Sequence, residues 1–371
     1  MLPSTPTSTV LPAVTTASGS LVAAHDDASA VSTWLERSTQ SENTLQSYKR
    51  ESERFLIWLR YKNLRLAEVM LEDVLQFKRL LSNPPAMWVG RKRPRNHPDW
   101  KPFTGPLSPV SIKYALSVIQ ILYRFLNDAR YLSGNPFALL PKDDVPEAPL
   151  ERYLEIETWE RLITFIGELP RETHLERQHA ARCRWLFFLL YLTGARRQEV
   201  AFARMGDFLI RDGRWWLRVT GKGNKTADIP VPDRLLEELK HYRLTLGLPE
   251  LPVPGETTPL VGRIRKAVKA KANNGEASLS AQAIYLIVKA VFIQFSDHLK
   301  QAGEIHLAEL ATKMSTHWLR HTSASHQLQN GIPLLHVSQN LRHSNIETTR
   351  RYLHTEQADR HDKTRGFGES R

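Results

Sequence analysis

The sequence predicts a mainly α-helical protein with one small antiparallel β-sheet, divided into two domains. Three observations lead to this prediction. The chain has 371 residues, 41% of them hydrophobic and 24% charged, which is the length and composition of two globular domains. Apolar residues recur at helical spacing through most of the chain. One stretch contains Asp212-Gly213 between two short apolar runs, which is a strong signal for a β-hairpin.

The N-terminal domain is predicted to be an all-α bundle over residues 30–140. One helix shows an apolar stripe with alternating steps of three and four residues: Leu45, Tyr48, Ser52, Phe55 and Leu59. A short helix fits residues 71–81. Another begins at Ser108, a capping residue followed by Pro109, and is expected to end at Gly134-Asn135-Pro136. Residues 1–29, rich in Ser, Thr, Ala and Pro, lack a secretory pattern and are predicted to form a disordered leader.

A proline-rich basic loop, residues 88–106, separates two of these helices. It has two open interpretations: an arm on DNA phosphates, with Trp88 or Trp100 available for stacking, or a solvated loop. The candidate DNA-binding residues of the whole chain are cationic: Arg91, Lys92, Arg93, Arg95, Lys113, Lys225 and Arg342. Residues 141–152, with three prolines and four acids, are predicted to form an extended linker.

The second domain, residues 153–371, is predicted to be α+β. Residues 208–210 and 215–219 form the first hairpin, and a second turn at 221–225 leads into a third strand at 228–231. The remaining segments are predicted to be helical, namely 185–192 as a core helix, 233–245, 279–301, 316–329, 333–341 and 345–354. The last of these has Ser344 and Glu347 as a capping box.

The net charge of +12 and the isoelectric point near 9.8 indicate a polyanionic partner, of which nucleic acid is the commonest. A membrane surface is not expected as a partner, because no basic amphipathic segment or lipidation signal is present. The single cysteine, Cys183, cannot form an intrachain disulfide and is predicted to be a small buried side chain. A cytoplasmic location is therefore predicted.

Arg196 and Arg320 are candidate ligands of a phosphodiester. A phosphate under attack gains negative charge on its non-bridging oxygens, and guanidinium groups fixed in advance stabilise that charge. Glu199 follows Arg196 by three residues and is expected to steer it. His317 precedes Arg320 by three residues, shares its helix face, and is a candidate general base for a tyrosine proton.

Tyr352 is the candidate nucleophile. It falls to the side of the apolar stripe of the last helix, so it need not be a core residue. His343 stands at the positive end of that helix, where it can donate to a phosphate oxygen. Lys222, at the tip of the second hairpin, is a candidate acid for the leaving 5′-oxygen, and His321 is a supporting residue.

No metal site is predicted. His317 and His321 are one helical turn apart, but position 318 is tryptophan and no cysteine or acidic third ligand is near them in the sequence.

These motifs resemble those of the tyrosine recombinase, or phage integrase, family. The resemblance rests on Thr193-Gly194-Ala195-Arg196 with Glu199, on the loop at 221–225, on the stretch His317 to Thr322, and on 341–346 followed by Tyr352. It covers nearly all of the second domain. It implies an N-terminal core-binding (SAM-like) domain and an integrase-type catalytic domain that together close on DNA as a C-shaped clamp.

The resemblance also implies the chemistry. Tyr352 attacks the scissile phosphate and forms a 3′-phosphotyrosyl link, while Arg196, His317, Arg320 and His343 activate the phosphate and Lys222 protonates the leaving oxygen. Neither ATP nor any other cofactor is implied. The implied assembly is a homotetramer on two double-stranded DNA sites, with accessory factors in some members. The 19-residue tail after Tyr352 suits docking on a neighbour.

One position departs from the family pattern. Arg342 stands directly before His343, where the family usually has glycine, which leaves open the local turn geometry and an added contact between Arg342 and a phosphate. Two other functions remain open. One is a type IB topoisomerase-like activity, which nicks and reseals without strand exchange. The other is a catalytically silent DNA-binding regulator. The biological task, whether integration, excision, resolution or transposition, is not specified by the sequence.

Overall fold

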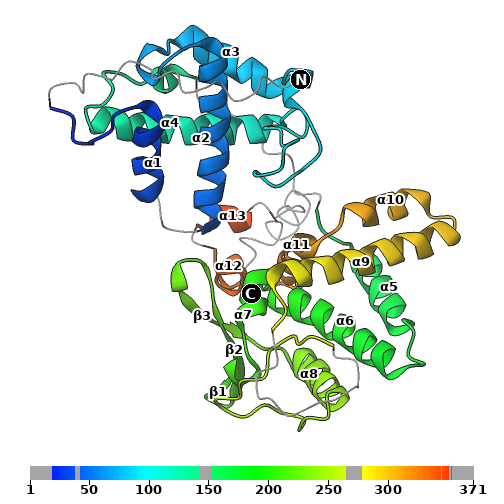
Figure 1. Ribbon diagram of the computed structural model, residues 1–371. Helices are drawn as coiled ribbons and strands as arrows, with labels where there is room; N and C mark the ends of the chain where they lie inside the picture. Colours follow the sequence, from blue (N-terminus) through cyan, green and yellow to red (C-terminus); the bar gives the residue numbers. More distant parts are fainter. Residues whose placement is uncertain are drawn as a thin grey trace, which may run out of the picture. The chain divides into compact units, whose positions relative to one another are not determined.

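The computed structural model describes residues 19–37, 42–141, 152–264, 278–343, 345–350 and 352. The chain divides into two compact units, Met1–Glu147 and Ala148–Arg371, each treated separately below (Figure 1). Residues 142–151 of the predicted linker and the tail after Tyr352 lie outside the described part of the chain.

The first unit is helical, as predicted. Phe55 lies at the centre of its core, with its ring 4.9 Å from that of Phe77 and 5.5 Å from that of Phe137. The helices are α1 (Asp27–Arg37), α2 (Glu42–Lys62), α3 (Leu71–Ser82) and α4 (Pro109–Asp128), with short 3₁₀ turns η1 (Leu66–Glu68), η2 (Ala86–Trp88) and η3 (Pro136–Leu139). The predicted cap is confirmed, because the Ser108 side chain accepts the backbone N–H of Ser111 at 3.3 Å.

Two predicted boundaries in this unit are wrong. The leader was expected to extend to residue 29, but α1 begins at Asp27, and Ala24 is fully buried in the core. The backbone N–H of Leu21 also donates to the carbonyl of Ala129, which ties this segment to the end of α4. Helix α4 ends at Asp128 rather than near Gly134, because the chain turns at Arg130, whose φ of 57° is left-handed.

The basic loop contributes to the core of the first unit. Trp88 is buried and stacks on Phe103 with a ring separation of 6.5 Å, so its indole is not available for stacking on a base. Arg95 lies over Trp100 at 4.2 Å and pairs with Glu53. The four predicted cations of this loop are all exposed: Arg91, Lys92, Arg93 and Arg95. Their contact with DNA remains a prediction.

The second unit combines helices with a three-stranded antiparallel sheet in the order β1-β2-β3, as predicted. Asp212 and Gly213 form the first turn with φ values of 51° and 69°, the left-handed pair that a tight two-residue hairpin requires. The strands are β1 (Phe208–Arg211), β2 (Arg214–Thr220) and β3 (Thr226–Pro230), with the turn η5 (Lys222–Asn224) between the last two and η4 (Met205–Asp207) before the first.

Helices precede and follow the three strands along the chain, and they form most of the second unit. Those predicted at 233–245 and 316–329 have the predicted bounds. The helix predicted from Asn345 begins instead at Glu347, whose backbone N–H donates to the Asn345 side chain at 2.9 Å, and the predicted cap Ser344 lies outside the described residues. Three described helices are not predicted by the sequence, namely α5, α7 and α10. The helices are α5 (Ile156–Gly167), α6 (His174–Thr193), α7 (Arg197–Phe202), α8 (Asp233–Thr245), α9 (Ala281–Gln301), α10 (Ile305–Lys313), α11 (Thr316–Gln329), α12 (Leu334–Asn340) and α13 (Glu347–Arg350).

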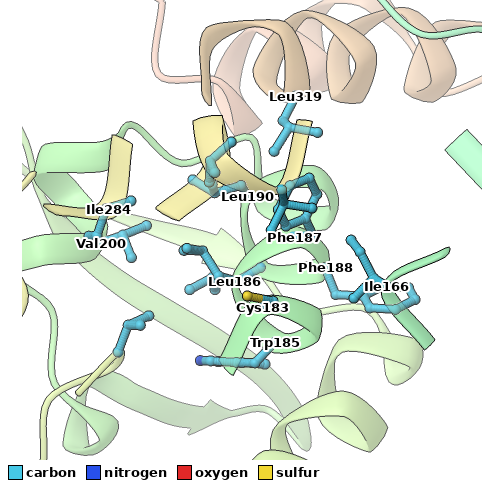
Figure 2. Close-up of a cluster of buried hydrophobic side chains, with 14 of the residues drawn as sticks. Ile166, Cys183, Trp185, Leu186, Phe187, Phe188, Leu190, Val200, Ile284 and Leu319 are labelled. Carbon is cyan, nitrogen blue, oxygen red and sulfur yellow. The ribbon is translucent and has the colours of Figure 1, made fainter. Parts of the chain in front are cut away.

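Helix α6 runs through the core of the second unit (Figure 2). Leu186, Phe187 and Leu190 are fully buried, and so is Cys183, which confirms both the core helix and the buried thiol. The indole N–H of Trp185 donates to the carbonyl of Leu260 at 2.9 Å, so this buried polar group is satisfied. Among the described helices, none combines the length and the apolar character that a bilayer span demands.

Candidate active site

The C-terminal end of α6 positions the first arginine. Gly194 ends this helix with φ 56° and ψ 23°, a left-handed cap that glycine adopts without strain. Arg196 then caps the start of α7. Its backbone N–H donates to Glu199 at 2.7 Å, and its Nη1 donates to the same carboxylate at 2.9 Å. The Arg196 side chain is 44% exposed, so its charge faces solvent, whereas Glu199 is 1% exposed.

Helix α11 carries the second arginine and two histidines. Arg320 is buried and donates from Nη1 to the carbonyl of Gly194 and from Nη2 to the carbonyl of Leu341. Its guanidinium therefore joins the end of α6 to the end of α12. The rings of His317 and His321 meet edge to face with centroids 4.2 Å apart, as expected for residues one helical turn apart.

Tyr352 lies against this helix. Its ring is 5% exposed and packs in a small cluster with Ala324, Val337 and Leu341. The prediction that Tyr352 falls to the side of the apolar stripe, and so need not be a core residue, is therefore wrong, because its ring is buried among apolar side chains. Its hydroxyl lies 2.6 Å from Nδ1 of His321. The sequence does not indicate this contact, because the two residues are 31 positions apart and the spacing of the motif favours His317 as the partner of the tyrosine.

His343 and Arg342 follow α12. The ring of His343 is nearly parallel to that of Tyr352, at 12° and 6.3 Å between centroids, and its Nδ1 lies 2.7 Å from Oγ1 of Thr349. Arg342 points inward and donates to Glu199 from Nη2 at 2.7 Å. Arg342 is therefore paired within the protein, and its predicted contact with DNA stays a prediction.

The electrostatics of this cluster favour an anion. Burial and the charges of nearby histidines and arginines lower the pKa of His321 to about 3 and that of His343 to about 4. His317 is exposed on one side, but desolvation by the surrounding protein and the charge of Arg320 lower its pKa as well. Burial and two neighbouring arginines lower the pKa of Arg320 to about 9, which still leaves it charged at neutral pH. A bound anion would relieve these unfavourable interactions.

The structure thus brings together seven of the eight predicted site residues: Arg196, Glu199, His317, Arg320, His321, His343 and Tyr352. The eighth, Lys222, lies in the turn between β2 and β3 as predicted, and its side chain is outside the described part of the structure. Lys113 and Lys225 are exposed, and their contact with DNA is untested. Within the described residues, no group of three potential metal ligands occurs.

Comparison with known proteins identifies the family. Residues 256–359 match the model of the phage integrase family. The tyrosine recombinase XerD of Staphylococcus saprophyticus subsp. saprophyticus is 30% identical over 249 residues, which cover 67% of this chain and 72% of that protein. The chain belongs to the phage integrase family of tyrosine recombinases. XerD of Shewanella oneidensis is 26% identical over 319 residues, covering 86% of this chain and 88% of that protein.

Solved structures of a recombinase and of an integrase share the fold. The XerH recombinase in a post-cleavage complex with a palindromic difH substrate has a TM-score of 0.60 and 18% identity, covering 94% of this chain and 86% of that one. A lambda integrase dimer bound to a COC′ core site has a TM-score of 0.55 and 15% identity, covering 88% and 76%. The chain is accordingly a site-specific DNA recombinase, which confirms the predicted enzyme class. The predicted mainly helical fold with one small antiparallel sheet is confirmed as well.

Proposed function

We propose that this recombinase cuts one strand of a double-stranded DNA site by attack of Tyr352 on a phosphate held by Arg196 and Arg320. The observation that carries this proposal is the gathering of one phenol, two guanidinium groups and three imidazoles around the ends of α6, α11 and α12. A phenol in such surroundings can replace the 5′-oxygen of the scissile phosphodiester, which gives a 3′-phosphotyrosyl bond and a free 5′-hydroxyl.

The two arginines have different tasks in this proposal. Arg320 is fixed by two backbone carbonyls, and these use only part of its five N–H donors. Arg196 presents its charge to solvent and receives the phosphate first. Because both cations are held before DNA arrives, they stabilise the charge of the pentavalent transition state with little reorganisation. His317 and His343 add donors once the anion raises their pKa values.

His321 takes the proton from the nucleophile. Its imidazole is neutral at neutral pH, so it can accept a hydrogen bond at Nδ1 from the phenol 2.6 Å away. Its low pKa opposes full proton transfer in the free protein. The negative phosphate beside it raises that pKa, so transfer becomes easier when DNA is bound. The free state therefore holds the phenol unreactive, and the substrate activates it.

The remaining roles follow from the family resemblance. Lys222, in the turn between β2 and β3, protonates the leaving 5′-oxygen. The 5′-hydroxyl of a partner strand then attacks the phosphotyrosine, so the bond energy is conserved. Because the ring of Tyr352 is buried, the segment that carries it shifts when the phosphate enters. The two units close around the duplex as a clamp, and four copies assemble on two sites for strand exchange.

A nicked suicide substrate tests the nucleophile. The duplex carries a site selected by the protein from random-sequence DNA, with a nick that lets the short 5′-hydroxyl fragment diffuse away after cleavage. Wild-type protein accumulates a covalent complex, and Tyr352→Phe does not. Tyr191→Phe is the matched control, because the Tyr191 hydroxyl lies 2.9 Å from Nδ1 of His326 in a second tyrosine–histidine pair. Covalent product from Tyr352→Phe would refute the assignment.

A further inference from the structure

Glu199 links three segments of the active site. Its carboxylate is 1% exposed and accepts hydrogen bonds from Arg196 at the start of α7 and from Arg342 after α12. The carboxylate also lies close to Gly221, the residue that precedes the Lys222 turn. A Cβ placed on Gly221 would be 3.3 Å from Oε1 of Glu199. A buried carboxylate in this position needs compensating charge, and two arginines supply it.

Arg342 occupies a backbone position that favours glycine. Its φ is 54°, in the left-handed region. Its N–H donates to the carbonyl of Gln339 at 2.9 Å, and the N–H of His343 donates to that of Ser338 at 3.0 Å. This is the Schellman pattern that ends a helix, with Arg342 at the position where glycine is usual. Arg342 therefore adopts the left-handed turn that suits glycine, although an arginine in this conformation is strained.

The side chain of Arg342 explains what the strained residue contributes. It is 11% exposed and grips Glu199 through two of its nitrogens, Nη2 at 2.7 Å and Nε at 3.3 Å. Nη2 also lies 3.3 Å from the carbonyl oxygen of Gly194, and Nη1 donates to that of Asn340. The carbonyl of Gly194 is thus shared by Arg342 and Arg320.

Arg342 also changes the net charge of the cluster formed by Arg196, Glu199 and Arg342. With glycine at position 342, Glu199 would neutralise Arg196 alone. With Arg342 present, one carboxylate is shared by two guanidinium groups, so the trio keeps a net charge of one positive unit. More of the charge of Arg196 is then available to a phosphate. The cluster also fixes the geometry, because a two-point grip between guanidinium and carboxylate restricts rotation of both groups.

We propose that Arg342 is a positioning residue for DNA cleavage, acting through Glu199 and the carbonyl of Gly194 to hold Arg196 and Arg320 in place. It does not touch the substrate. This inference rests on the proposed function. It replaces the idea of a phosphate contact by Arg342 with an internal role, in which the side chain supplies an anchor that a glycine at this position lacks.

The test compares Arg342→Gly with wild type in single-turnover cleavage of the suicide duplex. Glycine suits the left-handed turn, so the variant is expected to fold. At saturating DNA, its cleavage rate falls by about 10-fold or more, because misplaced phosphate ligands lose transition-state contacts. The apparent Kd for DNA changes much less. Guanidinium ions, supplied against matched sodium chloride, partly restore the rate by filling the vacated site beside Glu199.

A pH profile separates positioning from a purely structural role. Burial raises the pKa of Glu199, but Arg342 and Arg196 outweigh this effect and hold it below its ordinary value. The groups that face this carboxylate are Arg196 from α7, Arg342 from the turn after α12 and, through its field, Arg320 from α11. Loss of Arg342 therefore raises the pKa of Glu199. The cleavage rate falls where Glu199 becomes protonated, so the acidic limb of its pH profile moves to higher pH.

Arg130→Gly is the matched control. Arg130 is an exposed arginine of the first unit with a φ of 57°, so the variant removes the same charge from the same backbone conformation. It is expected to keep the wild-type limb and the wild-type saturated rate. If Arg342→Gly cleaved DNA at the wild-type rate, the role of Arg342 would be refuted and the proposed function would stand. A slower rate with an unmoved limb and no guanidinium rescue would refute that role as well. Absence of covalent product in wild type would overturn the proposed function, and this role with it.

Discussion

Gly194 is the residue at which the geometry of the site is most sensitive to a single methyl group. Its carbonyl accepts hydrogen bonds from Arg320 and Arg342, and its φ of 56° is left-handed. A Cβ at this position would lie 2.5 Å from Cδ2 of Leu341 and 3.3 Å from Oγ of Ser323. Gly194→Ala therefore combines backbone strain with a steric clash against Leu341, in the turn that carries His343.

The magnitude follows from these two effects. A left-handed alanine costs roughly 1–2 kcal/mol in the free energy of unfolding. Displacing the Leu341 side chain adds about 1–3 kcal/mol, typical of overpacking. For a unit of this size, 1 kcal/mol shifts Tm by roughly 2–4 °C, so the expected loss is on the order of 10 °C. A shift of the Gly194 carbonyl also moves Arg320, and cleavage falls by about 100-fold if the displacement approaches 1 Å.

Thermal unfolding followed by circular dichroism and single-turnover cleavage measure the two effects. Gly247→Ala is the matched control, because Gly247 has a φ of 72° and nothing lies within 4 Å of a Cβ placed there. The control should lose only the strain contribution, about 2–8 °C, and keep its cleavage rate. If the two variants lost equal stability and cleaved DNA equally well, the coupling between the end of α6 and the site would be refuted.

Two further predictions concern charge. Arg196→Ala should lower the single-turnover rate by roughly 10²–10³-fold with little change in Tm, because Arg342 still compensates Glu199; a rate within a factor of about 3 of wild type would contradict this. The free protein should become less stable as pH falls from 6.5 to about 4. The fold lowers the pKa of His321 to about 3 and that of His343 to about 4. The unfolded chain therefore binds more protons than the folded protein in this pH range, which favours unfolding. Urea unfolding at pH 7 and pH 5 measures this difference, and equal free energies of unfolding would count against it.

Features set by local interactions were predictable from the sequence. The hairpin at Asp212-Gly213 needs only two residues with left-handed backbones, and the helix at Ser108-Pro109 begins where a side chain caps it. The helix over 316–329 was predicted with the bounds that the structure shows. In each case the decisive interactions span a few positions, so no knowledge of the tertiary fold was required.

Weaker local signals led to errors. Helix α10 has only nine residues, too few for a helical pattern of apolar residues to stand out, and its fully buried residues are two alanines, Ala308 and Ala311. The segment before α1 has the composition of a disordered chain, yet the backbone of Leu21 pairs with Ala129, more than 100 residues away. Contacts of this range depend on the packing of the whole unit and have no counterpart in local composition.

The active site was predictable in its members and not in its contacts. Motif spacing identified Arg196, Arg320 and Tyr352 as residues that meet. Which histidine touches the phenol depends on how the last described turn packs on α11, and the structure gives this contact to His321. The inward direction of Arg342 was equally hidden, because it follows from the left-handed turn after α12 and from a carboxylate 143 positions earlier.

The nucleophile of the cleavage reaction is identified most directly by locating the DNA adduct on the protein. The covalent complex trapped on the suicide duplex is digested with protease and nuclease, and the nucleotide-bearing peptide is sequenced by tandem mass spectrometry. Cleavage by Tyr352 gives a single modified residue, Tyr352, joined to a 3′-phosphate. An adduct on any other residue, or a link to a 5′-phosphate, would contradict it.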